Sequence, residues 1–199
     1  MTILIGAIAN GKAFVGADTL WTWDDNFVRQ HHISKFVEPP VEGRYEVLIA
    51  TAGQDKFTQI LEKVLLEHPT LINIHDRASV VALVDTLHSA VKAAGIGDAD
   101  NNQLPEHDLG FLIASSGSDS LWVIESDYSI MEFKDYVCSG SGGYLGESAM
   151  RAMSKAGIFG DGAVQIALET VCDLHPYCGG DIDIREVTLN LDIAPSTDV

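Results

Sequence analysis

The sequence has few basic residues. Twelve lysines and arginines stand against 29 aspartates and glutamates, so the formal net charge is −17 at pH 7 over 199 residues. A protein that binds a phosphate backbone needs clustered lysine and arginine side chains, because these neutralise the phosphates. The composition therefore excludes nucleic acid from the expected partners.

Cysteines and long apolar runs are also scarce. The three cysteines are an odd number without framework spacing, and the first residues lack the charged segment and apolar stretch of a secretory signal. We therefore expect reduced thiols and a cytoplasmic protein. No apolar run approaches the roughly 20 residues that a membrane-spanning helix needs, so we expect no membrane insertion.

The length and the hydrophobic content of 46% suit one domain, residues 1–199, with a full core. Two short apolar segments, 3–8 and 13–17, flank Asn10-Gly11. Asn-Gly between apolar runs is a strong hairpin signal, because both residues tolerate positive φ. Two further strands are expected at 34–38 and 45–51, so four strands precede the first helix.

The apolar period changes along the rest of the chain. Apolar residues three or four apart predict helices at 57–65, 80–91, 144–156 and 163–174. The segment 95–107 is rich in Asp, Asn, Gly and Pro and predicts a loop, and strand patterns occur at 109–114, 121–125, 130–133 and 182–191. Separate blocks of strands and helices predict an α+β fold, a four-layer αββα sandwich with two stacked antiparallel sheets.

A Gly-rich run, Ser139-Gly140-Ser141-Gly142-Gly143, lies where a strand gives way to a helix. Free backbone N–H groups at such a place can bind an anion or an oxyanion. The spacing fits neither a dinucleotide fingerprint nor a P-loop, and a nucleophile elbow centred on Ser141 would need glycine at 139. A tight turn that needs small residues is the alternative interpretation.

Two patterns are of the kind that binds metals. One has the i, i+3, i+6 spacing of soft ligands at a helix end and consists of Cys172, His175 and Cys178. A fourth ligand could come from His31-His32, but nothing in the sequence brings these residues near. Buried cysteines are therefore favoured over a zinc site. The loop residues Asp98, Asp100 and Asn102 imitate the start of an EF-hand loop. Glycine at position 6 and glutamate at position 12 are missing from it, so it is interpreted as a solvated loop.

Two tryptophans, Trp21 and Trp23, follow the second strand closely and precede Asp24-Asp25. Large aromatic side chains at such a place either line a substrate groove or cover an edge of the core. Covering the core is the more frequent case.

Several motifs occur in the order of a known family. Thr2-Ile3-Leu4, the Asn10-Gly11 hairpin and Asp18 are followed by His32-Ile33-Ser34-Lys35-Phe36 and by Gly140-Ser141-Gly142-Gly143-Tyr144. Over nearly its whole length the chain resembles the proteasome β-subunit family of N-terminal nucleophile hydrolases. Within that family it resembles the bacterial HslV-type peptidases and bacterial proteasome homologues most.

The resemblance implies a catalytic set of Thr2, Asp18, Lys35 and Ser141. Threonine is a weak nucleophile, and the family places the base on the same residue, its α-amino group, which would be free only after Met1 is removed. Lys35, paired with Asp18, would lower the pKa of the threonine hydroxyl. The activity implied is that of a threonine endopeptidase.

Other residues receive supporting parts from the same resemblance. Ala50-Thr51-Ala52-Gly53 matches the floor of the family's substrate cleft, so substrate or oxyanion contacts are expected from Gly53, Thr51 and Thr22. Gly142, Cys178 and His175 would support the nucleophile. Here the chain departs from the family, because Cys178 replaces a serine and His175 replaces an aspartate.

The resemblance also implies partners. Proteasome-type subunits act on proteins or peptides inside homo-oligomeric double rings that an ATP-dependent unfoldase normally feeds. No cofactor is required, but backbone carbonyls near Cys172, His175 and Cys178 could bind a structural Na⁺ or Mg²⁺. Two alternatives stay open: a catalytically inactive ring subunit, favoured by the changes at 175 and 178, and a non-peptidase N-terminal nucleophile amidase.

Overall fold

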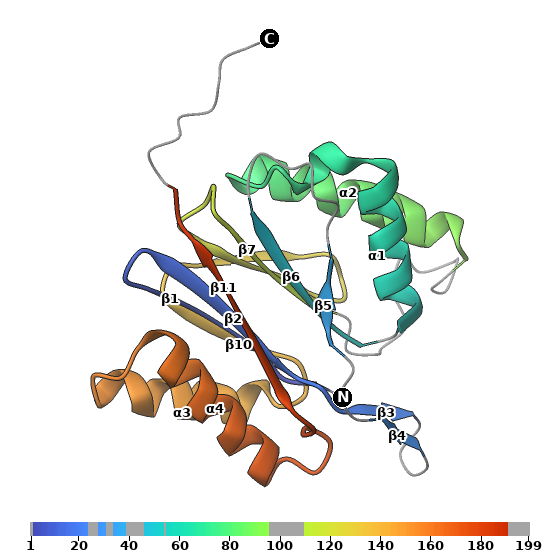
Figure 1. Ribbon diagram of the computed structural model, residues 1–199. Coiled ribbons are helices and arrows are strands. Elements are labelled where there is room, and N and C mark those ends of the chain that lie inside the picture. Colours follow the sequence, from blue (N-terminus) through green and yellow to red (C-terminus); the bar gives the residue numbers. More distant parts are fainter. Residues whose placement is uncertain are drawn as a thin grey trace.

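The computed structural model describes residues 2–23, 28–30, 34–38, 46–53, 55–95 and 110–190. Within these residues two antiparallel sheets lie face to face, and helices cover the outer face of each, as Figure 1 shows. The predicted α+β fold, a four-layer αββα sandwich, is confirmed.

The first sheet has the strand order β10-β1-β2-β11. Its centre is the hairpin of β1 (Leu4–Ala9) and β2 (Lys12–Asp18), joined by Asn10 and Gly11 with φ of 52° and 72°. Positive φ at both turn residues fits the right-handed twist of the two strands. The outer strands are β10 (Tyr136–Ser139) and β11 (Ile182–Thr188).

The second sheet has the order β5-β6-β7-β8-β9, with all four pairings antiparallel. Its strands are β5 (Phe36–Val37), β6 (Val47–Ala52), β7 (Gly110–Ser115), β8 (Leu121–Ile124) and β9 (Ile130–Phe133). Apolar side chains of both sheets, among them Leu4, Val15, Leu112 and Val123, are buried between them. This shared core holds the two sheets together through buried apolar surface.

Two helices cover each outer face. Helices α1 (Asp55–Glu67) and α2 (Arg77–Ala93) pack on the second sheet, with a short 3₁₀ helix, Pro69–Ile72, between them. Helices α3 (Gly143–Lys155) and α4 (Gly160–Leu174) pack on the first sheet. No helix in the described ranges is long and apolar enough to cross a membrane.

The structure differs from the sequence prediction at several boundaries. A small hairpin of β3 (Trp21–Trp23) and β4 (Val28–Gln30) was not predicted, because three-residue strands are too short to show a period. Helix α4 begins three residues earlier than expected, since its first turn contains two glycines and an aspartate rather than apolar residues. The loop residues Asp98, Asp100 and Asn102, like His31-His32, lie outside the described residues.

Candidate active site

The β1–β2 hairpin places Thr2 and Asp18 at the same end of the first sheet. Leu4 pairs with Ala17, so the residues just beyond the pair meet one another. The Asp18 carboxylate, fully buried, accepts a hydrogen bond from the Ile3 backbone N–H at 3.0 Å through Oδ1. The short hairpin thus fixes a carboxylate beside the backbone of the residue that follows Thr2.

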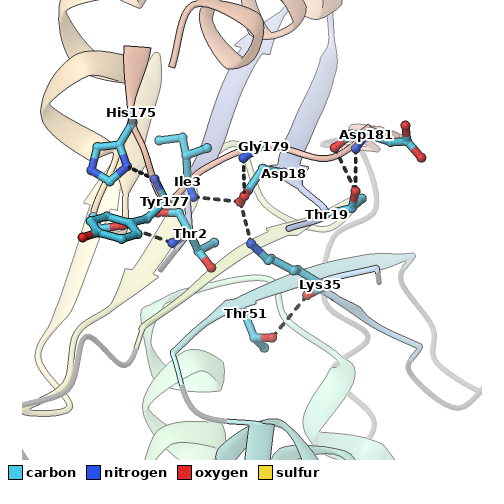
Figure 2. Close-up of polar contacts among 11 residues, drawn as sticks. Thr2, Ile3, Asp18, Thr19, Lys35, Thr51, His175, Tyr177, Gly179 and Asp181 are labelled. Carbon is cyan, nitrogen blue, oxygen red and sulfur yellow. Dashed lines mark hydrogen bonds and ion pairs between the residues drawn. The ribbon is translucent and has the colours of Figure 1, made fainter. Parts of the chain in front are cut away.

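Lys35 comes to the same carboxylate from the other sheet. Its ammonium nitrogen lies 2.5 Å from Asp18 Oδ1, and the residue is 3% exposed. Burial lowers the pKa of Lys35, while the charge of Asp18 and the hydrogen bond to it act in the opposite direction. Figure 2 shows Lys35 reaching across to Asp18, with Thr2 and Ile3 adjacent.

Two features that the sequence did not indicate hold this ion pair. The Gly179 backbone N–H donates to Asp18 Oδ2 at 3.0 Å, which gives the carboxylate a third donor. Thr51 donates to the Lys35 carbonyl oxygen through its backbone N–H at 2.8 Å and through its hydroxyl at 3.2 Å. Backbone donors carry no side-chain signature, so only the Gly179-Gly180 pair in the sequence could have indicated the first feature.

Ser141 lies beside Thr2 although 139 residues separate them in sequence. The Thr2 backbone nitrogen donates to Ser141 Oγ at 3.1 Å, and the Ser141 hydroxyl lies 3.3 Å from the Thr2 carbonyl oxygen, to which it can donate. The Gly142 N–H donates to the same carbonyl at 3.2 Å. These contacts hold both backbone polar groups of Thr2 against the Gly-rich run.

Glycine is required at two positions of that run. A Cβ atom on Gly140 would lie 2.4 Å from the Thr2 carbonyl oxygen, and one on Gly142 would lie 2.7 Å from Val171 Cγ1 and 3.1 Å from Cys178 Sγ. Gly140 also has φ of 87°, which residues with a Cβ rarely adopt. The run is therefore a place of close backbone approach, as well as a turn.

The loop after α4 packs behind Asp18. Thr19 and Asp181 are joined by three hydrogen bonds, two of which use the Thr19 hydroxyl, and Leu20 N–H donates to Gly179 O at 2.8 Å. His175 accepts the Tyr177 N–H on Nδ1 at 3.3 Å, so it orders its own loop. Figure 2 shows the Thr19–Asp181 and His175–Tyr177 contacts on the side of Asp18 away from Thr51.

Cys178 is 4% exposed. Burial raises the pKa of Cys178 to about 12; the charge of Asp18 acts in the same direction, and Lys35 and a hydrogen bond with Ser141 act weakly against it. Burial and the Asp18 charge likewise raise the pKa of Cys172 to about 11. Both thiols are therefore protonated at neutral pH.

Among the described residues no group of three or more His, Cys, Asp or Glu side chains could hold a metal ion, so the structure does not join Cys172, His175 and Cys178 in such a group.

The remaining expected contacts come from β6, from the residue that follows it and from the β3–β4 hairpin. Gly53 directly follows β6 with φ of 107°, and Thr22 pairs with Arg29 in the β3–β4 hairpin, although its side chain is outside the described part. The Thr51 hydroxyl accepts from the Thr58 hydroxyl at 3.0 Å as well as donating to Lys35. The indole N–H of Trp21 is buried and has no hydrogen-bond partner among the described residues.

Comparisons with known proteins find similar folds among solved structures but no match at the level of sequence. No protein-family model and no curated protein matches the sequence. Among solved structures, Thiobacillus denitrificans BPH has a TM-score of 0.79 at 18% identity, and the match covers 94% of this chain and 98% of that one. BPH in complex with epoxomicin has a TM-score of 0.79 at 17% identity and the same coverage. Eukaryotic HslV from Trypanosoma brucei has a TM-score of 0.68 at 14% identity, covering 94% and 99% of the two chains.

The two-sheet α+β sandwich is the fold of these structural neighbours and is consistent with the N-terminal nucleophile hydrolase fold. At these sequence identities the similarity establishes the fold alone. The fold of the structural neighbours is the one that the resemblance of the sequence to the proteasome β-subunit family implied. The four expected catalytic residues come together from four separate places in the chain. Asp18 contacts Lys35 and Ser141 contacts Thr2, while Ile3 links the two pairs.

Proposed function

We propose that the protein is a threonine-type endopeptidase that cleaves peptide bonds through the Thr2 hydroxyl after removal of Met1. The observation that carries the proposal is the position of Thr2 between two polar groups: its nitrogen lies 3.1 Å from Ser141 Oγ, and the buried Asp18–Lys35 pair adjoins the next residue. A free amine there would be a base on the nucleophile's own residue. The likeness to BPH, which binds epoxomicin, supports the same class of activity.

The proposed reaction has two halves. The Thr2 hydroxyl oxygen attacks the scissile carbonyl carbon while its proton passes to the Thr2 α-amine. The Gly53 N–H donates to the resulting oxyanion, and the Lys35 ammonium favours the negative charge that develops on the attacking oxygen. The C–N bond then breaks, and the leaving amine takes the proton from the α-ammonium.

The ester that remains on Thr2 is cleaved in the second half. Water attacks the ester carbonyl carbon, and the Thr2 amine accepts the proton of that water. Breakage of the ester bond returns the proton to the threonine oxygen. Ser141 holds the amine throughout, because its hydroxyl can accept from an ammonium and donate elsewhere.

The proposal extends to assembly and location. We propose a homo-oligomeric double ring in the cytoplasm that acts on protein or peptide substrates, with an ATP-dependent unfoldase as a candidate partner. The ring subunits of HslV-type peptidases, which the sequence resembles, enclose their sites in a chamber. A structural Na⁺ or Mg²⁺ on backbone carbonyls near Cys172, His175 and Cys178 belongs to the same proposal, and the chemistry above uses no cofactor.

An inactive ring subunit is the second candidate. The observation that favours it is the buried, protonated thiol of Cys178 beside Ser141, where the family has a serine. A thiol is a weaker hydrogen-bond partner than a hydroxyl, so the support of Ser141 is weaker here. The two candidates differ in whether Thr2 reacts.

One experiment separates them. Intact-mass spectrometry first establishes whether Met1 has been removed from purified protein, which is then incubated with fluorogenic peptides and with epoxomicin. We expect peptide hydrolysis, its loss after epoxomicin treatment, and an adduct on the Thr2 peptide. The Thr2→Ala variant is the control and should show neither hydrolysis nor adduct. Processed protein that neither hydrolyses peptides nor forms the adduct would contradict the proposal and leave the inactive subunit.

A further inference from the structure

The segment that carries Lys35 has little backbone pairing. Its strand β5 consists of Phe36 and Val37 and stands at the end of the described order of the second sheet, so among the described strands it pairs with β6 alone. Lys35 lies just before this strand, and its carbonyl oxygen accepts from Thr51 of β6. Backbone pairing therefore fixes only a short piece of the segment. Further contacts decide how firmly the Lys35 ammonium is held beside Asp18.

Arg185 of β11, in the first sheet, contacts the same segment. Its guanidinium group donates to Glu38 Oε1 at 2.5 Å and to Ser34 Oγ at 3.2 Å. The guanidinium carbon also lies 4.4 Å from the centre of the Phe36 ring, within the range of a cation–π interaction. One side chain thus contacts three alternate residues of the segment, and two of them are the chain neighbours of Lys35.

Asp183 completes this group of contacts on β11. Its Oδ2 atom accepts from Ser34 Oγ at 2.9 Å and from the Arg185 guanidinium at 3.3 Å. The guanidinium therefore contacts two carboxylates, that of Glu38 in the segment and that of Asp183 on β11. Single exposed ion pairs contribute little, but a forked guanidinium that joins several partners in a network is the exception. Without its positive charge the two carboxylates would repel each other.

Strand β11 also pairs with the strand that carries Asp18. Ile182 of β11 is the register partner of Asp18 in β2, and Asp183 follows Ile182 directly. The contacts of Arg185 therefore tie the segment of Lys35 to the strand beside Asp18. This matters for catalysis, because a displacement of about 1 Å at a reacting group can lower a rate by about a hundredfold.

We propose that Arg185 is a positioning residue for Lys35. Its guanidinium fixes the residues on both sides of Lys35 and thereby keeps the Lys35 ammonium beside Asp18. The inference rests on the proposed peptidase function, in which this ammonium favours the negative charge on the attacking oxygen of Thr2. Arg185 acts through Lys35 rather than on the substrate.

The test compares Arg185→Ala with the unmodified chain, both processed and assembled. Peptide hydrolysis gives kcat and KM, and intact-mass spectrometry over time gives the rate and the final extent of the epoxomicin adduct on Thr2. We expect kcat and the adduct rate to fall together by about ten- to a hundredfold while KM stays close to its original value, because the lost contribution belongs to the transition state. The final extent of the adduct should equal that of the unmodified chain.

The extent of the adduct separates positioning from structural damage. A variant that is merely unfolded in part would form less adduct, and its folded fraction would react at the original rate. Arg185→Lys is the milder variant, because it keeps a positive charge between the two carboxylates. A single ammonium cannot replace the forked donors, so this variant should also react slowly and to full extent, with a smaller loss of rate.

Arg77→Ala is the matched control. Arg77 is an exposed arginine of α2 that donates to the Ile130 carbonyl oxygen of β9 at 3.2 Å, so it also links two elements, and its loss should leave both rates unchanged. Unchanged rates in both Arg185 variants, or less adduct formed at an unchanged rate, overturn the positioning role alone. Processed, unmodified protein that neither hydrolyses peptides nor forms the adduct overturns the peptidase function and this role with it.

Discussion

The Lys35 ammonium nitrogen lies 2.5 Å from Asp18 Oδ1, and neither side chain has more than 2% of its surface exposed. Removing two charges from water costs about as much free energy as their attraction returns, so such a pair is weak evidence for stability as a whole. The loss of one partner is different, because the other charge then stays buried and uncompensated. The pair therefore fixes the position of Lys35 between the sheets.

Lys35→Met should abolish peptide hydrolysis and lower the free energy of unfolding. Methionine keeps an unbranched chain of similar length, but within the described part of the chain the Asp18 carboxylate would retain only the N–H donors of Ile3 and Gly179. Breaking a buried pair typically costs about 3–5 kcal/mol. Urea unfolding followed by circular dichroism measures the loss, and fluorogenic peptides measure the activity.

Lys12→Met is the matched control for this variant. Lys12 also pairs with a carboxylate, that of Glu186, at 2.6 Å, but both side chains are 40% or more exposed. Exposed pairs contribute about 1 kcal/mol or less, so stability and activity should stay close to those of the unmodified chain. Equal losses in the two variants would show that burial of the Lys35 pair has no special importance.

The pH dependence of activity should show the lowered pKa of Lys35. Burial lowers this pKa below the ordinary value of 10.5, so the folded chain loses the ammonium proton at a lower pH than the unfolded chain does. Between the two values the unfolded state binds more protons, and the Lys35 contribution to unfolding free energy rises with pH. Activity that needs the ammonium should fall over the same range, so kcat/KM should have an alkaline limb below pH 10.5.

Lys35→Arg tests the origin of that limb. A guanidinium group stays charged throughout this range, so any residual activity of the variant should not fall in the same way. Profiles of kcat/KM from pH 6 to 10.5 for both proteins provide the comparison. The same alkaline limb in both would assign it to another group.

Local signals account for the parts of the fold that the sequence predicted. Asn10-Gly11 indicated the hairpin that brings Asp18 beside Ile3, and the three-to-four-residue period indicated the helices. The contact of Lys35 with Asp18 joins two sheets, and the contact of Ser141 with Thr2 spans 139 residues. A local sequence pattern carries no information about contacts between residues so far apart in the chain. The four expected catalytic residues were therefore predicted only from the resemblance to a family.

Other features had no sequence signal at all. The Gly179 N–H that binds Asp18 is a backbone group, and the β3–β4 hairpin is too short to show a period. A pocket of about 310 Å³ beside Gly140 is formed where the ends of several strands meet, so only the three-dimensional packing creates it. Contacts of this kind depend on tertiary structure rather than on residue type.

Gly142→Ala should lower both stability and activity. The added Cβ would lie 2.7 Å from Val171 Cγ1 and 3.1 Å from the Ile3 Cβ and from Cys178 Sγ, so the Gly-rich run must move. Overpacking of this kind costs about 1–3 kcal/mol, and the movement disturbs the N–H that binds the Thr2 carbonyl. Thermal unfolding and peptide hydrolysis measure the two effects.

Gly162→Ala provides the matched control in α4. A Cβ there meets nothing within 4 Å, and the residue lies in a helix, so alanine should raise stability by up to about 1 kcal/mol. Activity should not change. If both variants behave alike, the close approach at Gly142 has no energetic consequence.

Alkylation of the two thiols near the site should follow their pKa values. Only the thiolate reacts with iodoacetamide, and burial raises the pKa of Cys178 to about 12, so at pH 8 about one molecule in ten thousand carries the thiolate. Cys172, with a pKa of about 11 and a partly exposed side chain, should react sooner, and both should react readily in urea. Tryptic mass spectrometry over time measures each rate.

Activity should fall only as Cys178 becomes modified, because a group added there would displace Ser141 from Thr2. Loss of activity in step with Cys172 alone would contradict this assignment.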